Sequence, residues 1–200
     1  MTAKKDAKSL GRPRSFDKDA AVDTAVRLFR SRGYDAVGVA ELVSELGIKP
    51  PSFYAAFGSK AGLFRQALER YAAGETNIFT GALEQGGGVR KVIERTFANA
   101  TRVYPEDRGV AGCMVIDASR NSSDPEARAL GAEARQASFE AIRDFIATEF
   151  PERAEELAQM VIIALSGMSA VARDGADRST LETFAANFGR AFAREIEAAA

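Results

Sequence analysis

The segment spanning residues 47–60, GIKPPSFYAAFGSK, constrains the fold more than any other part of this 200-residue chain. Gly47 is suited to end a helix over about residues 39–46, since glycine readily adopts the left-handed backbone found at such ends. Pro51 suits the start of a second helix over about 51–57, because the first helical position needs no backbone N–H. Two short helices joined by about four residues that include a glycine have the geometry of a helix-turn-helix.

Helical periodicity continues along the chain and predicts an all-α fold of about nine helices. Apolar residues recur at intervals of three and four, and no segment reads convincingly as a strand. Capping signals mark several helix starts, such as the capping box formed by Ser179 and Glu182. The expected helices cover about residues 17–32, 39–46, 51–57, 60–83, 89–103, 112–120, 125–149, 151–173 and 179–198.

The composition excludes several kinds of chemistry. The chain contains no His and one Cys, which excludes imidazole ligands, cysteine clusters for zinc and His-activated nucleophiles. The triple glycine at residues 86–88 precedes a helix but lacks the Lys-Ser/Thr pair of a P-loop. We therefore expect no enzymatic activity, no metal site and no cofactor.

Neither export nor a membrane partner is expected. The N-terminus is charged and polar, unlike the apolar signal segment of an exported protein. No run approaches the roughly 18 apolar residues that a membrane span needs. The sequence therefore predicts a cytoplasmic protein.

Basic residues are concentrated in the first third of the chain. Residues 1–70 carry 13 Lys and Arg against 8 Asp and Glu, whereas residues 71–200 carry 14 against 20. Arg12 and Arg14 belong to a basic flexible arm over residues 1–14, where Pro13 disfavours helix. The helix-turn-helix lies in this basic part, so double-stranded DNA is the expected partner.

The second short helix presents side chains suited to reading a DNA groove. Lys49 can donate to guanine, Ser52 can bond several base edges, and Ala55 or Ala56 can touch a thymine methyl group. Tyr54 and Lys60 lie at the rim of this surface, where a phenol and an ammonium group meet phosphates. The same pattern also fits an αα-corner with a solvated face, in an all-helical binding or scaffold protein without DNA function.

The sequence around these positions resembles the N-terminal domain of the TetR/AcrR family of transcriptional regulators, over about residues 12–71. The PPSxYAAFGSK form of residues 50–60 is similar to one recurring branch of that family, and Gly112-Cys113-Met114 resembles the same branch. The resemblance is carried by Arg12-Pro13-Arg14, Leu28-Phe29, Gly33-Tyr34, Val39-Ala40-Glu41-Leu42-Val43, Leu46-Gly47-Ile48, Ser52-Phe53-Tyr54, Phe57, Ser59-Lys60 and Leu63-Phe64.

The resemblance implies a homodimer with a DNA-binding domain over residues 15–75, whose helix-turn-helix spans about 38–57. Residues 76–200 would form the ligand-binding and dimerisation domain, and the dimer would form through the last two helices, about 152–173 and 179–198. Carried onto this chain, the resemblance implies base-facing positions at Val39, Lys49, Pro50, Pro51 and Ser52, and phosphate contacts at Tyr54 and Lys60.

This chain departs from the family pattern at two places. Gly38 and Val39 stand where many members have Thr or Ser, so a hydroxyl contact at the start of the first short helix is missing. Ala55 and Ala56 replace the aromatic residue or His of other branches. Base reading would therefore depend on few side chains, with DNA shape and the basic arm contributing more.

Family members are mostly repressors that a small molecule releases from a palindromic operator, so we expect a small apolar or reactive effector. The helix over residues 60–83 is the only continuous link from Lys60 to the body, and we expect the ligand signal to pass along it.

Cys113 follows a glycine at an expected helix N-terminus, where the pKa of a thiol tends to fall. It is either a sensor of reactive compounds or a buried inert thiol. The other candidate pocket residues are Phe79, Phe97, Tyr104, Met114, Phe139 and Met168.

Overall fold

The computed structural model describes residues 16–74, 77–105, 107 and 109–197, and Arg12 and Arg14 of the expected arm lie outside these residues. The described residues form ten α-helices and one 3-10 turn, so the expected all-α class is confirmed. The elements are α1 (Lys18–Arg32), α2 (Val39–Glu45), α3 (Pro50–Phe57), α4 (Lys60–Ala73), α5 (Thr80–Leu83), α6 (Val89–Val103), α7 (Met114–Asp117), α8 (Pro125–Ala147), η1 (Pro151–Arg153), α9 (Ala154–Arg173) and α10 (Arg178–Glu197).

The expected single helix over residues 60–83 is wrong, and this error explains why nine helices were expected. Helix α4 ends at Ala73, and α5 begins only at Thr80. The side chain of Asn77 accepts hydrogen bonds from the backbone N–H groups of Phe79 and Thr80, at 3.2 and 3.1 Å, and donates to the carbonyl of Ala72 at 2.6 Å. Asparagine side chains compete with helical hydrogen bonds in this way, so the polar residue opens a turn inside a run of helical periodicity.

The expected helix over residues 112–120 is shorter than predicted. Its regular part, α7, is a single turn between Met114 and Asp117, which Cys113 precedes as N-cap. Pro151 opens the 3-10 turn η1 and α9 follows it, rather than one helix beginning at Pro151.

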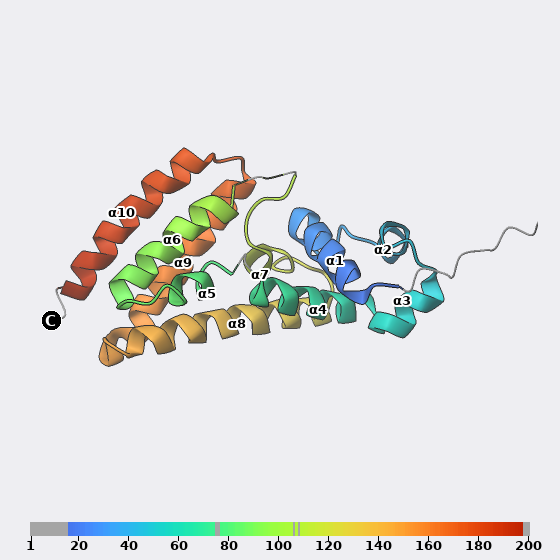
Figure 1. The fold of residues 1–200 in the computed structure, drawn as a ribbon, viewed down its shortest axis with the longest axis horizontal. Coiled ribbons are helices and arrows are strands. Elements are labelled where there is room, and N and C mark those ends of the chain that lie inside the picture. The colour runs from blue at the N-terminus through green and yellow to red at the C-terminus, as the bar shows by residue number, and fades with distance from the viewer. Residues whose placement is uncertain (1–15, 75–76, 106, 108, 198–200) are drawn as a thin grey trace, which may run out of the picture.

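Helices α1 to α4 form a compact head at one end of the molecule (Figure 1). Helix α1 packs along α4, and α2 and α3 lie beyond them. Aromatic rings fill the centre of the head: the ring centroids of Phe29 and Phe64 lie 5.1 Å apart, and that of Tyr34 lies 5.0 Å from Phe64. Buried aromatic side chains remove large apolar areas from water, so these rings stabilise the packing of the head.

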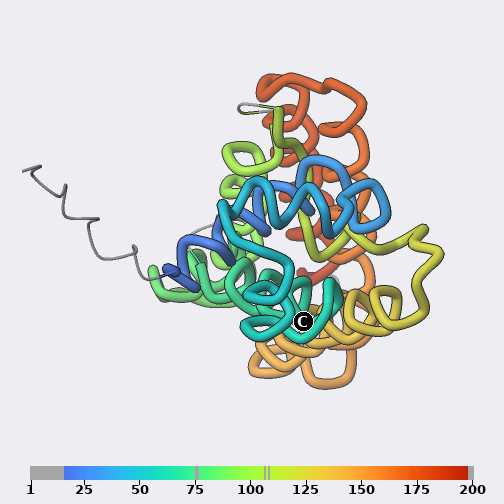
Figure 2. Tube along the Cα trace, turned by 90° about the vertical axis from the view of Figure 1, so that its right-hand side faces the viewer, coloured from blue at the N-terminus to red at the C-terminus, as the bar shows by residue number. Residues whose placement is uncertain are grey.

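The core of the head continues into elements that follow it by more than forty residues. Met114, Val115 and Ala118, in and beside α7, belong to the same buried cluster as the head, as do Ala127 and Leu130 of α8. Viewed from the head end of the molecule, the head lies in front of the other helices, with the start of α8 beside it (Figure 2). The expected boundary at residue 75 stays a prediction, and a shared core crosses it.

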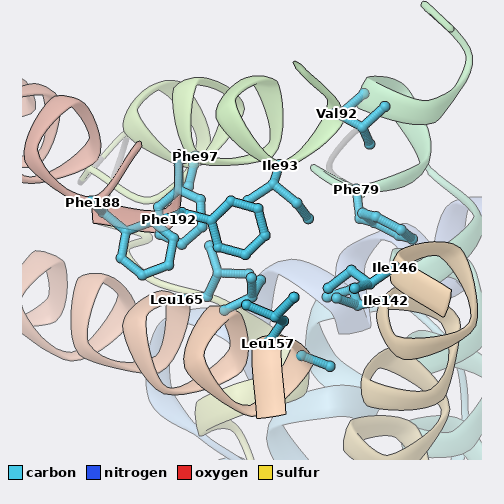
Figure 3. Packing of buried hydrophobic residues seen from close by; sticks show 14 of the residues in the cluster. Phe79, Val92, Ile93, Phe97, Ile142, Ile146, Leu157, Leu165, Phe188 and Phe192 are labelled. Carbon is cyan, nitrogen blue, oxygen red and sulfur yellow. The ribbon is translucent and has the colours of Figure 1, made fainter. Parts of the chain in front are cut away.

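The body is a second cluster built from α6, α9, α10 and the C-terminal half of α8. Figure 3 shows aromatic side chains of α6 and α10 meeting aliphatic ones of α8 and α9 at its centre. The rings of Phe97 and Phe188 are stacked with centroids 4.1 Å apart. Helix α10 packs chiefly on α6, and α9 on α8.

Within the described residues one helical stretch, Pro151–Arg173, is long and apolar enough by composition to cross a membrane, although no such run was expected. Its mean hydropathy over 18 residues is 1.3, and 44% of that window is buried inside the protein. This composition is also typical of the central helix of a bundle, which is the position that α9 occupies between α8 and the other body helices.

Candidate nucleic-acid interface and ligand pocket

Helix α3 is anchored by one face and exposes the other. Phe53 and Phe57, one helical turn apart, are buried in the head core. The turn before the helix uses Gly47 at a φ of 62°, a conformation that costs other residues energy. Over residues 49–57 the exposed residues are Lys49, Pro50, Pro51, Ser52, Tyr54 and Ala55.

Four of the predicted base-facing residues therefore share one free surface at the N-terminal end of α3. Lys49 is the N-cap, and its carbonyl accepts hydrogen bonds from Ser52 N at 2.9 Å and Phe53 N at 3.1 Å. The side chain of Tyr54 is 52% exposed on the same helix. Val39 differs from the others because it is half-buried at the start of α2 and packs on the head core. A role for these residues in binding DNA stays a prediction.

Lys60 is engaged inside the protein as well as at its surface. Its Nζ lies 3.9 Å from the centroid of the Tyr34 ring, a cation–π contact. Partial burial lowers the pKa of Lys60, against the opposing attraction of Asp35 and Asp124. Tyr34 donates its hydroxyl to Asp124 at 2.9 Å. The predicted phosphate contact of Lys60 would thus come from an ammonium group that also packs on the ring of Tyr34.

A second set of contacts joins the head to the loop between α7 and α8. Asp35 accepts hydrogen bonds from the hydroxyl of Ser122, from Ser123 N at 2.7 Å and from Ser123 Oγ at 2.9 Å. These donors hold the pKa of the Asp35 carboxyl below its usual range. Tyr34 N donates to the carbonyl of Ala118 at 2.6 Å.

Arginines extend the same junction toward the body. Arg30 donates to the carbonyls of Gly112 at 2.9 Å and Val103 at 2.5 Å. Arg173 at the end of α9 donates to the carbonyl of Arg30 at 3.0 Å. The expectation that residues 60–83 alone link head and body is therefore wrong, because the segment around α7 connects them as well.

A cavity of about 610 Å³ lies between these junction elements and the body. Residues of α4, α5, α7, α8 and α9 surround it, and most of its wall is apolar. It is lined by Arg65, Leu68, Glu69, Tyr71, Ala72, Asn77, Ile78, Phe79, Thr80, Tyr104, Cys113, Val115, Ile116, Arg120, Leu130, Glu133, Ala134, Arg135, Ala137, Ser138, Ala141, Ile142, Ile162, Leu165 and Ser166.

The cavity brings together three of the seven predicted ligand residues, namely Phe79, Tyr104 and Cys113. The other four, Phe97, Met114, Phe139 and Met168, lie outside its lining. Phe97 and Met168 are buried in the body core and Met114 in the head core, while Phe139 is half-buried against the body core. Large apolar residues mark cores and cavities alike, so residue type alone did not separate them.

The pKa of the Cys113 thiol is raised, unlike that of many thiols at helix N-termini. Burial raises the pKa of this thiol, and the helix that follows it has only four residues. The N–H of Cys113 donates to Ser169 Oγ at 2.7 Å, and Ser169 in turn donates to Asp117 at 2.6 Å. Tyr71 and Tyr104 lie against the sulfur. The thiol is therefore protonated at neutral pH.

The cavity also has a polar wall that the sequence did not predict. Arg65, Arg120 and Arg135 line the cavity together with Glu69 and Glu133. In the sequence, charged residues that line a cavity cannot be distinguished from charged residues on an exposed helix face. No periodic pattern therefore identified these five.

The last two helices expose apolar side chains. Ile163 and Val171 on α9 are 71% and 44% exposed, and Phe184 on α10 is 41% exposed. Gly167 lies on α9 between the first two, and no atom lies within 4 Å of where a Cβ would stand on it. Exposed apolar residues grouped on adjacent helices mark interaction surfaces.

Comparison with known proteins agrees with this geometry. Residues 21–67 match the tetR family of bacterial regulatory proteins. Over 98% of its length the chain is 39% identical to the whole of the HTH-type transcriptional repressor BdcR of Escherichia coli K12. It is 34% identical to the HTH-type transcriptional repressor ComR of the same organism, over 87% of the chain and 88% of ComR.

Solved structures show the same architecture. A cysteine mutant of the TetR family transcriptional regulator CifR, complexed with 26-base-pair double-strand operator DNA, superimposes with a TM-score of 0.80 at 32% identity, covering 90% of this chain and 99% of that one. The TetR-family regulator SCO4454 of Streptomyces coelicolor has a TM-score of 0.74 at 18% identity, covering 89% of this chain and 95% of that one, and shares the fold.

Proposed function

The chain belongs to the tetR family of bacterial regulatory proteins, and from this premise we propose that it is a repressor that binds a palindromic operator as a dimer and is released by a small molecule. BdcR and ComR are repressors by name, and CifR was solved on operator DNA. The observation that carries the proposal is the free face of α3, whose opposite face is fixed by Phe53 and Phe57. A short helix anchored in this way can enter the major groove without rearranging the head.

Contacts with DNA divide into two kinds on this surface. Lys49 and Ser52, with the edge of Pro50 and Pro51, would meet base edges and choose the sequence. Tyr54 and Lys60 would meet phosphates and fix the position of the helix without reading sequence. Val39 would add an apolar contact at most, because its side chain is partly buried against the head core.

The dimer would form through α9 and α10, as the exposed Ile163, Val171 and Phe184 support. A pair of these two-helix surfaces makes a four-helix contact related by a twofold axis. The axis would place two copies of α3 about 34 Å apart, one turn of DNA, so that successive major grooves are read.

The cavity is placed to control the distance between the two heads. Helix α4 and the segment at α7 both line it, and both also hold the head. A ligand that fits the cavity better when these elements are displaced would favour a state with weaker operator affinity. The apolar wall and the volume of about 610 Å³ suit a small organic effector.

Three finer assignments belong to the same proposal. On the motif of residues 50–60 we assign the chain to the branch of the family with the PPSxYAAFGSK motif. We assign it no enzymatic activity, since its relatives are named as transcriptional regulators. As a reader of chromosomal operators it would act in the cytoplasm.

The test begins with selection of operator fragments from a random duplex library by the purified full-length protein. Fluorescence anisotropy then measures the affinity of the recovered operator for wild type, Lys49→Ala and Lys60→Ala. We expect Lys49→Ala to weaken the operator complex more than complexes with unrelated DNA. Lys60→Ala should weaken both alike and lower the slope of log affinity against log salt by about one.

Lys91→Ala is the matched control, since Lys91 is an exposed lysine on α6 of the body. Its affinity and salt slope should equal those of wild type. Failure to enrich any duplex, with no salt-dependent binding to DNA, would support the alternative of an all-helical scaffold. Equal operator affinity for Lys49→Ala and wild type would remove Lys49 from base reading.

A further inference from the structure

Two arginines converge on one turn of helix at the edge of the cavity. Arg120, just after α7, donates from Nε to the carbonyl of Ile116 at 3.3 Å. Arg135, on α8, donates from Nη1 to the carbonyl of Val115 at 3.4 Å. Both carbonyls belong to α7, and all four residues line the cavity. Each guanidinium uses one N–H group in a single long hydrogen bond, so most of its donors remain available.

The two positive charges lack a partner within the described part of the chain. Neither arginine forms an ion pair there, and the nearby Asp117 is already bonded to Ser169 at 2.6 Å. Burial lowers the pKa of Arg135, and the charge of Arg120 lowers it further, while Asp117 raises it. Glu69 and Glu133 also line the cavity, and both are exposed. Asp117 offsets only one of the two like charges, so the pair is suited to an added anion.

The rest of the cavity is suited to an apolar group. Leu68, Phe79, Ile142 and Leu165 are buried residues in its wall. The hydroxyl of Tyr71, which also lines the cavity, faces the sulfur of Cys113. Sulfur is a weak hydrogen-bond acceptor, so an oxygen atom on a bound molecule would be a better partner for this hydroxyl.

We propose that the effector is an amphipathic oxyanion, whose carboxylate or phosphate head binds Arg120 and Arg135 while its apolar part fills the cavity. This inference rests on the proposed function for its regulatory meaning, but the binding itself does not depend on DNA. A planar guanidinium pair can hold a carboxylate or phosphate by parallel hydrogen bonds. The carboxylate or phosphate would lie against α7, and Tyr34 N in the DNA-binding head donates to the carbonyl of Ala118 just beyond that turn. A shift of α7 on binding would therefore be passed to the DNA-binding head.

The test uses four probes that share a ten-carbon chain and differ in the head group. Decanoate and decyl phosphate carry an oxyanion, decanol is neutral, and decylammonium is a cation. Isothermal titration calorimetry on the full-length protein without DNA, below the micellar concentration of each probe, measures affinity. Operator anisotropy with and without each probe is recorded separately.

We expect at least one oxyanion to bind about tenfold or more tightly than decanol, with decylammonium weaker still. Arg135→Gln and Arg120→Gln should each lower the affinity for that oxyanion by about tenfold and leave the affinity for decanol unchanged. The matched control is Arg143→Gln, an arginine of the same helix that is paired with Asp144 and lies outside the cavity lining. Its affinities should equal those of wild type, and a thermal melt of each variant checks that folding is retained.

The two anionic probes distinguish the head groups, and the tighter one identifies the chemistry. Equal affinity for decanol and both oxyanions, or no binding of either oxyanion, overturns the inference. Unchanged oxyanion affinity in both cavity variants overturns it as well. Oxyanion binding that leaves operator affinity unaltered supports the ligand class and counts against release by ligand as the function.

Discussion

The close approach of α3 and α4 makes Gly62→Ala a sharp test of how the DNA-reading helix is held. A Cβ on Gly62 would lie less than 3.0 Å from the carbonyl oxygen of Phe57 and 3.3 Å from its carbonyl carbon. Both atoms are backbone, so no side chain can turn aside to make room. A normal contact is about 3.5 Å or more, so the end of α3 would have to move by more than about 0.5 Å from the first turn of α4.

Two opposing effects set the size of the result. Overpacking of a close contact costs about 1–3 kcal/mol, and a backbone neighbour places this case in the upper part of that range. Alanine is favoured over glycine within a helix by about 1 kcal/mol, which offsets part of the cost. We therefore expect a net loss of about 1–2 kcal/mol in the free energy of unfolding. Operator affinity should fall too, because Phe53 and Phe57 anchor α3, so a displacement of its end moves the exposed face of the helix.

Urea unfolding followed by circular dichroism measures the first quantity, and operator anisotropy the second. Gly81→Ala in α5 is the control, since the nearest atom to a Cβ there is Asn99 Nδ2 at 3.9 Å. It should lose no stability and keep wild-type operator affinity. If Gly62→Ala were as stable as wild type and bound operator equally well, the argued approach of α3 and α4 would be wrong.

Three further predictions concern the junction, the thiol and the body core. Hydrogen-bond donors hold the pKa of Asp35 below the ordinary carboxyl value. The stability that Asp35 contributes is therefore fully present above a pH of about 3.9 and is lost as pH falls through the lower folded pKa. The difference in urea midpoint between wild type and Asp35→Asn should shrink below a pH of about 3.9. The raised pKa of Cys113 predicts that iodoacetamide modifies it more slowly at neutral pH in the native protein than after unfolding, as mass spectrometry would measure, and equal rates would contradict its burial. Phe97→Ala should cost about 3–5 kcal/mol in urea unfolding because the ring is fully packed, whereas the partly exposed Phe16 should cost far less when changed to Ala.

Much of the head could be predicted from sequence, because its signals are local. Gly47, Ser59 and the pair Phe53 and Phe57 each act within a few residues of their own position, so turn, cap and buried face follow from the chain itself. The split between α4 and α5 did not follow, because the deciding bonds of Asn77 compete with an otherwise regular helical pattern.

The candidate cavity was less predictable, since its polar wall depends on residues that meet only after folding. Arg120 and Arg135 are separated by fifteen positions and lie on different elements, and only the carbonyls of α7 bring them together. Cys113 shows the opposite case, because it follows a local signal for a helix N-terminus but precedes a helix of only one turn. Burial by Tyr71 and Tyr104 dominates there, and no local pattern announces it.

The core that the head shares with α7 and α8 limits how this protein can be recombined. A chimera that joins the first 75 residues to another regulator's body would separate Phe64 and Tyr71 from Met114, Ala127 and Leu130. It would also remove the acceptor of the Tyr34 hydroxyl, Asp124, which caps α8 as well. Exchange of DNA specificity between relatives should therefore either transplant residues 112–130 with the head or be confined to the exposed face of α3, which can be rewritten without disturbing the junction.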